Sequence, residues 1–108
     1  MGQEMMGLIS GHSACGDGTA ANPAVAVSIS LGFRPRYVKV VTVDATTSSI
    51  MTEWIYGMTA AKGMQLKNDT TFKYTELAAN GITVSATGFT IGTGCVTATK
   101  KYHWLAIA

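Results

Sequence analysis

A short segment near the start of the chain carries the residue types from which a nucleophilic active site is built. Residues 11–16 read GHSACG, so a histidine, a serine and a cysteine stand close together. A serine nucleophile elbow has the pattern G-x-S-x-G between a buried strand and a helix, but Cys15 stands where the second glycine belongs. A cysteine nucleophile needs a histidine that the fold positions beside it, and the chain offers His12 and His103. The spacing does not support a hydrolase, and we expect no enzymatic activity.

Acid–base catalysis needs carboxyl groups that converge, and the carboxylates of this chain are scattered over expected turns and strands. Glu53 deserves separate treatment, because partial burial beside Trp54 would raise the pKa of its carboxyl. Neighbouring residues of a strand point to opposite faces, so a solvent or interface position for Glu53, opposite Trp54, is the favoured interpretation. The six carboxylates are Glu4, Asp17, Asp44, Glu53, Asp69 and Glu76.

The two cysteines do not form a metal-binding pattern. Cys15 and Cys95 are far apart in the chain, and neither belongs to a CxxC pair or a histidine cluster, which zinc modules require. We therefore expect no metal and no cofactor. Free thiols are the simpler expectation for both residues, and a disulfide is the alternative, because the sequence does not define a redox compartment.

The composition narrows the classes of partner. The 108 residues suit one domain, and charged residues make up 13% against about 25% in a typical soluble domain. A net charge of +2 is too small for general binding to nucleic acid. No apolar run approaches the ~20 residues of a membrane-spanning helix, and residues 1–11 lack the basic and apolar regions of an export signal. We expect neither nucleic acid nor membrane as a partner.

The pattern along the chain predicts an all-β fold. Residues 1–22 contain a stretch of Gly, Ser, Ala and Thr, which predicts a flexible or extended N-terminal arm, and residues 23–108 predict a single β domain. Turn signals recur about every 8–12 residues, which is typical of a compact antiparallel β-sandwich or barrel of about seven short strands. The expected strands are residues 24–31, 37–43, 50–56, 71–75, 101–107 and two joined by a tight turn within 81–92, whereas residues 58–67 predict a short turn or loop.

Two of the expected strands are apolar on both faces. Residues 37–43 and 102–108 place apolar side chains at odd and at even positions. A strand with two apolar faces is covered on both. In a domain of this size we expect one of the two covers to be another chain, and the low charge fits that interpretation.

Seven aromatic residues within the expected strands could also stack on sugar rings. In strands with this alternation, they are more often anchors of a core or an interface. They are Trp54, Tyr56, Phe72, Tyr74, Phe89, Tyr102 and Trp104.

Four short patterns, taken in order, resemble small β-rich virion structural proteins of tailed bacteriophages, of the capsid decoration or cement type. They are LGFRPRYVKV at 31–40, EWIYGM at 53–58, GITVSATGFTIG at 81–92 and KKYHWLAIA at 100–108. The resemblance implies a non-enzymatic protein that binds the outside of the capsid shell and stabilises it. It implies the major capsid protein and sister copies as partners, often in a homotrimer, and a place on the capsid surface after synthesis in the host cytoplasm. The alternative is a tail-fibre, spike or other tail-associated domain that recognises a host glycan.

An assembly role leads to an expected set of interface residues. The apolar side chains of the arm suit a segment that docks in a groove or adds a strand to a sheet. The grouped cations after residue 32 suit an acidic protein surface. The expected interface residues are Met5, Met6, Leu8, Ile9, Arg34, Arg36, Lys39 and Trp54.

Overall fold

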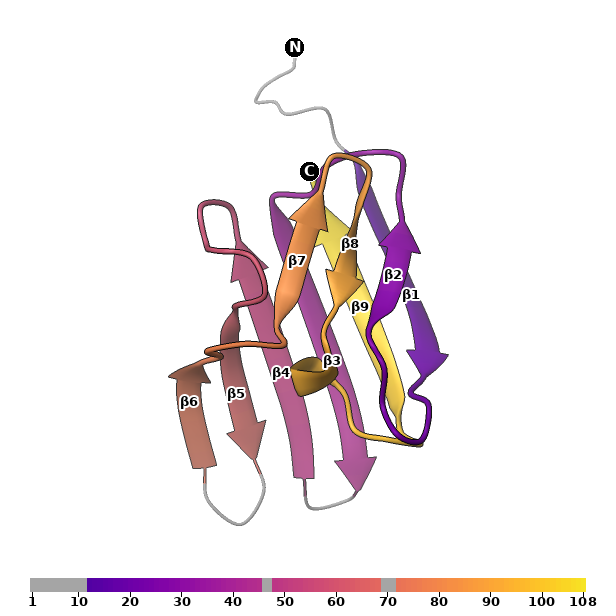
Figure 1. The fold of residues 1–108 in the computed structure, drawn as a ribbon, viewed down its shortest axis with the longest axis vertical. Coiled ribbons are helices and arrows are strands. Elements are labelled where there is room, and N and C mark those ends of the chain that lie inside the picture. Colours follow the sequence, from indigo (N-terminus) through magenta and orange to yellow (C-terminus); the bar gives the residue numbers. More distant parts are fainter. Residues whose placement is uncertain (1–11, 46–47, 69–71) are drawn as a thin grey trace.

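The computed structural model describes residues 12–45, 48–68 and 72–108, and these form a sandwich of two antiparallel sheets (Figure 1). The larger sheet has six strands in the order β1-β9-β3-β4-β5-β6, and the smaller has three in the order β2-β8-β7. The expectation of an all-β antiparallel fold is confirmed. No helix in the described ranges is long and apolar enough to cross a membrane.

The strands are short, and one turn of 3-10 helix, η1, follows the smaller sheet. The elements in chain order are β1 (Ser13–Thr19), β2 (Val27–Ser30), β3 (Tyr37–Ala45), β4 (Ser48–Ile55), β5 (Met64–Asn68), β6 (Phe72–Glu76), β7 (Ile82–Ser85), β8 (Gly88–Ile91), η1 (Thr93–Cys95) and β9 (Lys101–Ile107).

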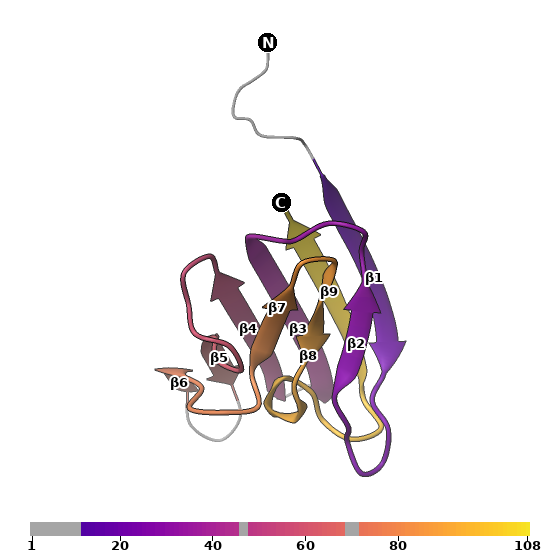
Figure 2. The same cartoon turned by 45° about the horizontal axis from the view of Figure 1, so that its top comes forward.

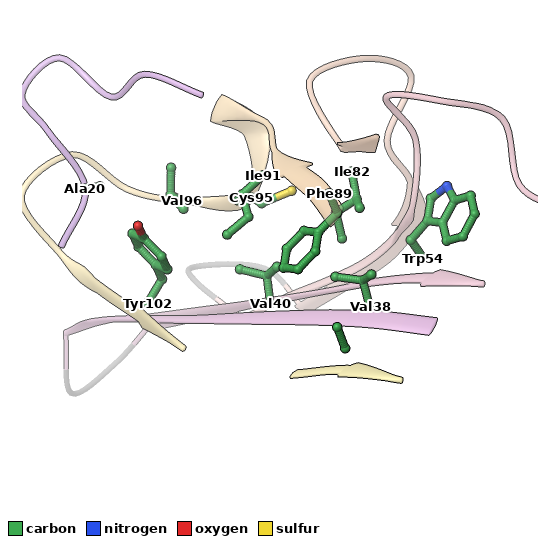
Figure 3. Packing of buried hydrophobic residues seen from close by; sticks show 11 residues of the cluster. Ala20, Val38, Val40, Trp54, Ile82, Phe89, Ile91, Cys95, Val96 and Tyr102 are labelled. Carbon is green, nitrogen blue, oxygen red and sulfur yellow. The ribbon is translucent and has the colours of Figure 1, made fainter. Parts of the chain in front are cut away.

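The core lies between the two sheets and is built by the alternation of the strands. In β3, Val38 and Val40 have no exposed surface, and Figure 3 shows both pointing from that strand toward Phe89 and Cys95. β-Branched side chains pack well on a pleated surface, which suits β3 to the middle of the sheet. Phe89 from the smaller sheet also meets the ring of Trp104 edge to face, with centroids 5.4 Å apart.

A polar network ties η1 to the inner face of the larger sheet. Thr42 Oγ1 donates a hydrogen bond to the carbonyl oxygen of Cys95 at 2.9 Å. Gln65 Nε2 donates to Thr52 Oγ1 at 3.1 Å and to the carbonyl oxygen of Gly94 at 2.8 Å. Because buried polar groups need partners, these bonds fix the 3-10 turn over β3, β4 and β5.

Part of the segment expected as an arm belongs to the sheet. β1 pairs with β9 along its whole length, so the expected arm boundary at residue 22 is wrong for residues 13–19. Gly16 and Gly18 face the aromatic rings of Trp104 and Tyr102 from the neighbouring strand. The glycines suggested an irregular segment because they supply no apolar pattern, but here the absent side chains leave room for the rings.

Another unexpected strand, β5, occupies part of residues 58–67, which were expected to form a turn or loop. β5 runs from Met64 to Asn68 and pairs with β4 and β6. Its alternation is inverted, since Gln65 is buried and Met64 and Leu66 lie on the other face. A pattern with the polar residue inside does not indicate a strand over a core, and this accounts for one of the two strands beyond the seven expected.

Candidate functional site

The face of the larger sheet that points away from the smaller sheet is broad and apolar. We call it the outer face. Figures 1 and 2 show the smaller sheet on one side of the larger sheet, with β5 and β6 extending past it. The outer face carries every second residue of each strand, among them Cys15, Asp17, Tyr37, Lys39, Val41, Val43, Met51, Glu53, Ile55, Met64, Leu66, Tyr74, His103, Leu105 and Ile107.

Several large apolar side chains of this face are exposed to solvent. Val43 is 56% exposed, Ile55 54% and Tyr74 57%, and Leu105 and Ile107 are each more than a third exposed. Isolated exposed apolar residues are ordinary, but a contiguous set marks an interaction surface. The outer face is therefore the candidate functional site.

The register of the strands aligns these side chains in rows across the sheet. Val41 pairs with Met51, Met51 with Leu66 and Leu66 with Tyr74. These four residues cross β3, β4, β5 and β6 and form a continuous apolar row. Side chains of directly paired residues lie on the same face and contact one another. The four side chains of the row therefore form one continuous apolar surface.

A pair of opposite charges lies beside the apolar row. Lys39 and Glu53 are paired residues of β3 and β4, and Tyr37 donates a hydrogen bond from its hydroxyl to Glu53 Oε2. Burial, that hydrogen bond and the nearby carboxylate together raise the pKa of Tyr37 to about 12. Glu53 thus lies on the face opposite Trp54, as the alternation predicted.

An ion pair lies at the edge of the outer face. Lys101 Nζ is 3.3 Å from Asp17 Oδ2, with both side chains more than half exposed. An exposed pair of this kind contributes little to stability because solvent screens it. Its importance is that the charges of the outer face occur as neighbours of opposite sign.

The structure does not bring the three expected cations together. Lys39 lies on the outer face, whereas Arg36 stacks over the ring of Tyr56 at 5.1 Å. Arg36 belongs to the segment before β3, where its amide donates to the carbonyl oxygen of Ile107. Arg34 is exposed two residues earlier. Of the three, Lys39 belongs to the candidate site.

Trp54 is a core residue, so its expected place at an interface is wrong. The side chain is 4% exposed and its Nε1 donates to the carbonyl oxygen of Thr59 at 3.4 Å. The alternation of β4 puts Trp54 on the same face as Thr52, and Figure 3 shows its ring in the core cluster beside Ile82. The expected interface residues Met5, Met6, Leu8 and Ile9 lie outside the described residues.

The outer-face residues Met51, Leu66 and Tyr74 were missing from the expected interface. The pattern that points to them is the one noted for residues 37–43, which have apolar side chains on both faces. The same pattern in the neighbouring strands would have indicated a second apolar face across the sheet. That pattern was incomplete because β5 was not expected to be a strand. Its two apolar side chains complete the face.

The residues with nucleophilic potential do not form an active-site geometry. The His12 ring lies against Phe33, with centroids 5.4 Å apart, and Cys15 is exposed on the outer face. His103 pairs with Asp17 on the same open surface. Among the described residues no hydrogen bond joins a serine or cysteine to a histidine, and no cluster of His, Cys, Asp and Glu could hold a metal.

The two cysteines are both free thiols, one exposed and one buried. Burial raises the pKa of Cys95 to about 11, against smaller opposing effects of hydrogen bonds from Thr52 and Gly92. A buried thiol with a raised pKa behaves as a small apolar side chain rather than as a nucleophile.

The smaller sheet has a shallow hollow on its own solvent side. Hydroxyl-bearing residues surround it, and Ser28 and Thr90 share a hydrogen bond across the two strands at 3.2 Å. The hollow measures about 210 Å³ and its lining includes no charged side chain. It lacks the titratable groups from which a catalytic site is built.

The described residues define an antiparallel β-sandwich with an exposed apolar face on its larger sheet. No family model, no curated protein and no solved structure matches the chain.

Proposed function

We propose that the protein is a non-enzymatic structural protein of a bacteriophage virion, of the capsid decoration or cement type. The observation that carries the proposal is the apolar outer face of the larger sheet. Half-exposed side chains such as Val43, Ile55 and Tyr74 lose contact with water only when another protein covers them, and that burial drives association.

Two further features support an assembly role. The four short patterns that resemble phage decoration proteins lie within residues 31–108, which contain β3 to β9. The charged fraction of 13% is low for a domain that is fully solvated, and apolar side chains on the outer face account for part of the deficit. A decoration protein is surrounded by neighbours and needs less charge.

The tail-associated alternative has weaker support. Glycan recognition uses exposed aromatic faces, but Trp54, Phe89 and Tyr102 are each 5% exposed or less. Tyr56 and Tyr74 are exposed, yet Tyr56 follows the end of β4 and Tyr74 lies on β6 at the edge of the sheet. They do not form one stacking platform.

The experiment that tests the proposal is the copy number of the chain in purified particles. Quantitative mass spectrometry of virions should give a copy number comparable with that of the major capsid protein. A few copies per particle would indicate the tail, and absence from the particle would overturn a virion role.

A matched pair of variants connects the copy number to the outer face. Met51→Lys places a charge in the middle of the apolar row, and we expect it to reduce occupancy of the particle. Lys73→Glu is the control, because Lys73 is exposed on the opposite face of β6. Equal occupancy of both variants would show that the outer face does not attach the protein to the particle.

A further inference from the structure

The centre of the outer face coincides with the centre of the larger sheet. With the strand order β1-β9-β3-β4-β5-β6, the boundary between β3 and β4 has three strands on each side. Lys39 and Glu53 pair across this boundary, and so do Val41 and Met51. Each of these pairs is therefore placed symmetrically about the middle of the face.

We propose that the outer face binds a second copy of this chain, around a two-fold axis that runs along the strands between β3 and β4. Such an axis places β3 of each copy over β4 of the other. Lys39 of each copy then faces Glu53 of the other, and Val41 faces Met51. A two-fold contact uses the same patch on both subunits and must be self-complementary, and this register meets that condition for charge and for apolar area.

The flanking strands obey the same symmetry. The axis brings β9 over β5, so that Leu105 of one copy lies over Met64 of the other, since both belong to the row of Lys39 and Glu53. It brings β1 over β6, the two edge strands. In the row of Val41 and Met51, the axis brings His103 of β9 over Leu66 of β5. The edge strands β1 and β6 form the rim, which is the more polar part of ordinary protein interfaces.

The face is large enough for a stable pair. Six strands spaced about 4.8 Å apart, with strands of about seven residues rising ~3.4 Å each, cover roughly 700 Å² in projection. Side-chain relief makes the accessible area larger, so the face approaches the ~800 Å² that each partner buries in a standard interface. Two such sheets pack face to face at about 10 Å, as sandwich sheets do.

Charge favours a second copy over an acidic or a basic partner. The outer face carries the cations Lys39 and Lys101 and the anions Asp17, Glu53 and Glu76. The signs nearly balance, and the two central strands carry opposite charges, Lys39 on β3 and Glu53 on β4. A strongly acidic partner would repel the anions of this face, and a strongly basic partner would repel its cations. A second copy, related by the two-fold axis, places Glu53 opposite Lys39 and Lys39 opposite Glu53.

The test uses two charge-reversal variants of the full chain. Lys39→Glu sets two carboxylates against each other in a homodimer, and Glu53→Lys sets two ammonium groups against each other. Each variant alone should weaken the dimer at least about tenfold, because like charges opposed across an interface are costly. An equimolar mixture should dimerise again, since every central pair is then of opposite sign. Analytical ultracentrifugation over a concentration series measures all three.

The mixing experiment distinguishes contacts between two copies from contacts within a single chain. Each single variant also loses the neighbouring charge pair inside its own chain, and mixing does not restore that pair. Lys73→Glu, on the opposite face, is the control and should dimerise like the unmodified chain. Circular dichroism of each variant before mixing shows that the strands are intact.

Three outcomes would overturn the proposal: an unmodified chain that is monomeric, an unmodified chain that is trimeric, or a mixture that stays as dissociated as its components. None of these affects the virion role by itself. A monomeric chain that still loses particle occupancy on Met51→Lys would place the capsid shell, rather than a second copy, on the outer face. Failure of the dimer and failure of the proposed function are thus distinguishable.

Discussion

Gly16 of β1 lies directly opposite Trp104 of β9, and the indole ring fills the space that a side chain at position 16 would need. A Cβ added at Gly16 would lie 2.7 Å from Cζ2 of the ring, closer than real contacts allow. The aromatic ring covers the bare backbone of a glycine strand, an arrangement that stabilises sheets containing glycine.

Substitution at Gly16 should therefore destabilise the fold although the residue is in a strand. We expect Gly16→Val to lower the free energy of unfolding by about 1–3 kcal/mol, since the indole must leave its packed position, and Gly16→Ala to have a smaller effect of the same sign. Chemical denaturation measures both. Ser13→Ala, at an exposed position of the same strand, is the control. A Gly16→Val variant as stable as the control would show that the ring has room to move.

The buried amide of Gln65 gives a second prediction. Gln65→Leu removes the donor that serves Thr52 Oγ1 and the carbonyl oxygen of Gly94, so one buried and one partly buried acceptor lose a partner. We expect a loss of about 1–3 kcal/mol in the free energy of unfolding. Thr75→Ala is the control, because Thr75 pairs with Gln65 in the sheet but is exposed. If both variants unfold at the same denaturant concentration, the network around η1 contributes nothing measurable.

The strands that follow the ordinary alternation could be predicted from the sequence. Residues 37–43, 50–56 and 101–107 correspond closely to β3, β4 and β9. β1 and β5 could not, because their inner positions carry Gly16, Gly18 and Gln65 instead of apolar residues. The inner face of β1 is completed by the aromatic rings of β9, and that of β5 contacts the backbone of η1. Such long-range partners leave no local pattern in the sequence.

The candidate site was predictable in kind but not in detail. Double apolarity of residues 37–43 indicates two covered faces, and the structure exposes one of them. Alternation separates the two faces of β4, but it does not show which one meets the smaller sheet. Trp54 was therefore assigned to an interface and is in the core, whereas Met51, on the opposite face, belongs to the candidate site.

The hydrogen bond between Tyr37 and Glu53 gives a pH-dependent prediction. The pKa of Tyr37 is raised from 10.0 to about 12, by burial first and then by the hydrogen bond and the charge of Glu53. A raised pKa in the folded state means that its contribution to stability is complete below pH 10 and is lost as the pH rises toward 12. Glu53→Gln keeps an acceptor but removes the charge, so Tyr37 should ionise at lower pH.

The ultraviolet absorbance of tyrosinate follows that ionisation, and Tyr37→Phe identifies the signal that belongs to this residue. The difference between the titrations of the unmodified chain and Tyr37→Phe should contain a step near pH 12. An identical step in the Glu53→Gln chain would mean that the charge of Glu53 does not contribute, and that burial and the hydrogen bond set the pKa of Tyr37.

The two cysteines should differ in reactivity by their positions in the sandwich. Cys15 is exposed on β1 and should react rapidly with an aromatic disulfide reagent at protein concentrations where the chain is monomeric. Cys95 has no exposed surface and a pKa raised to about 11, so its thiol reacts only when the core opens. We expect one fast thiol in the folded chain and two after denaturation, and no fast thiol in folded Cys15→Ser. A fast reaction in that variant would show that η1 opens readily, and would contradict the rigid packing of the turn between Thr42 and Gln65.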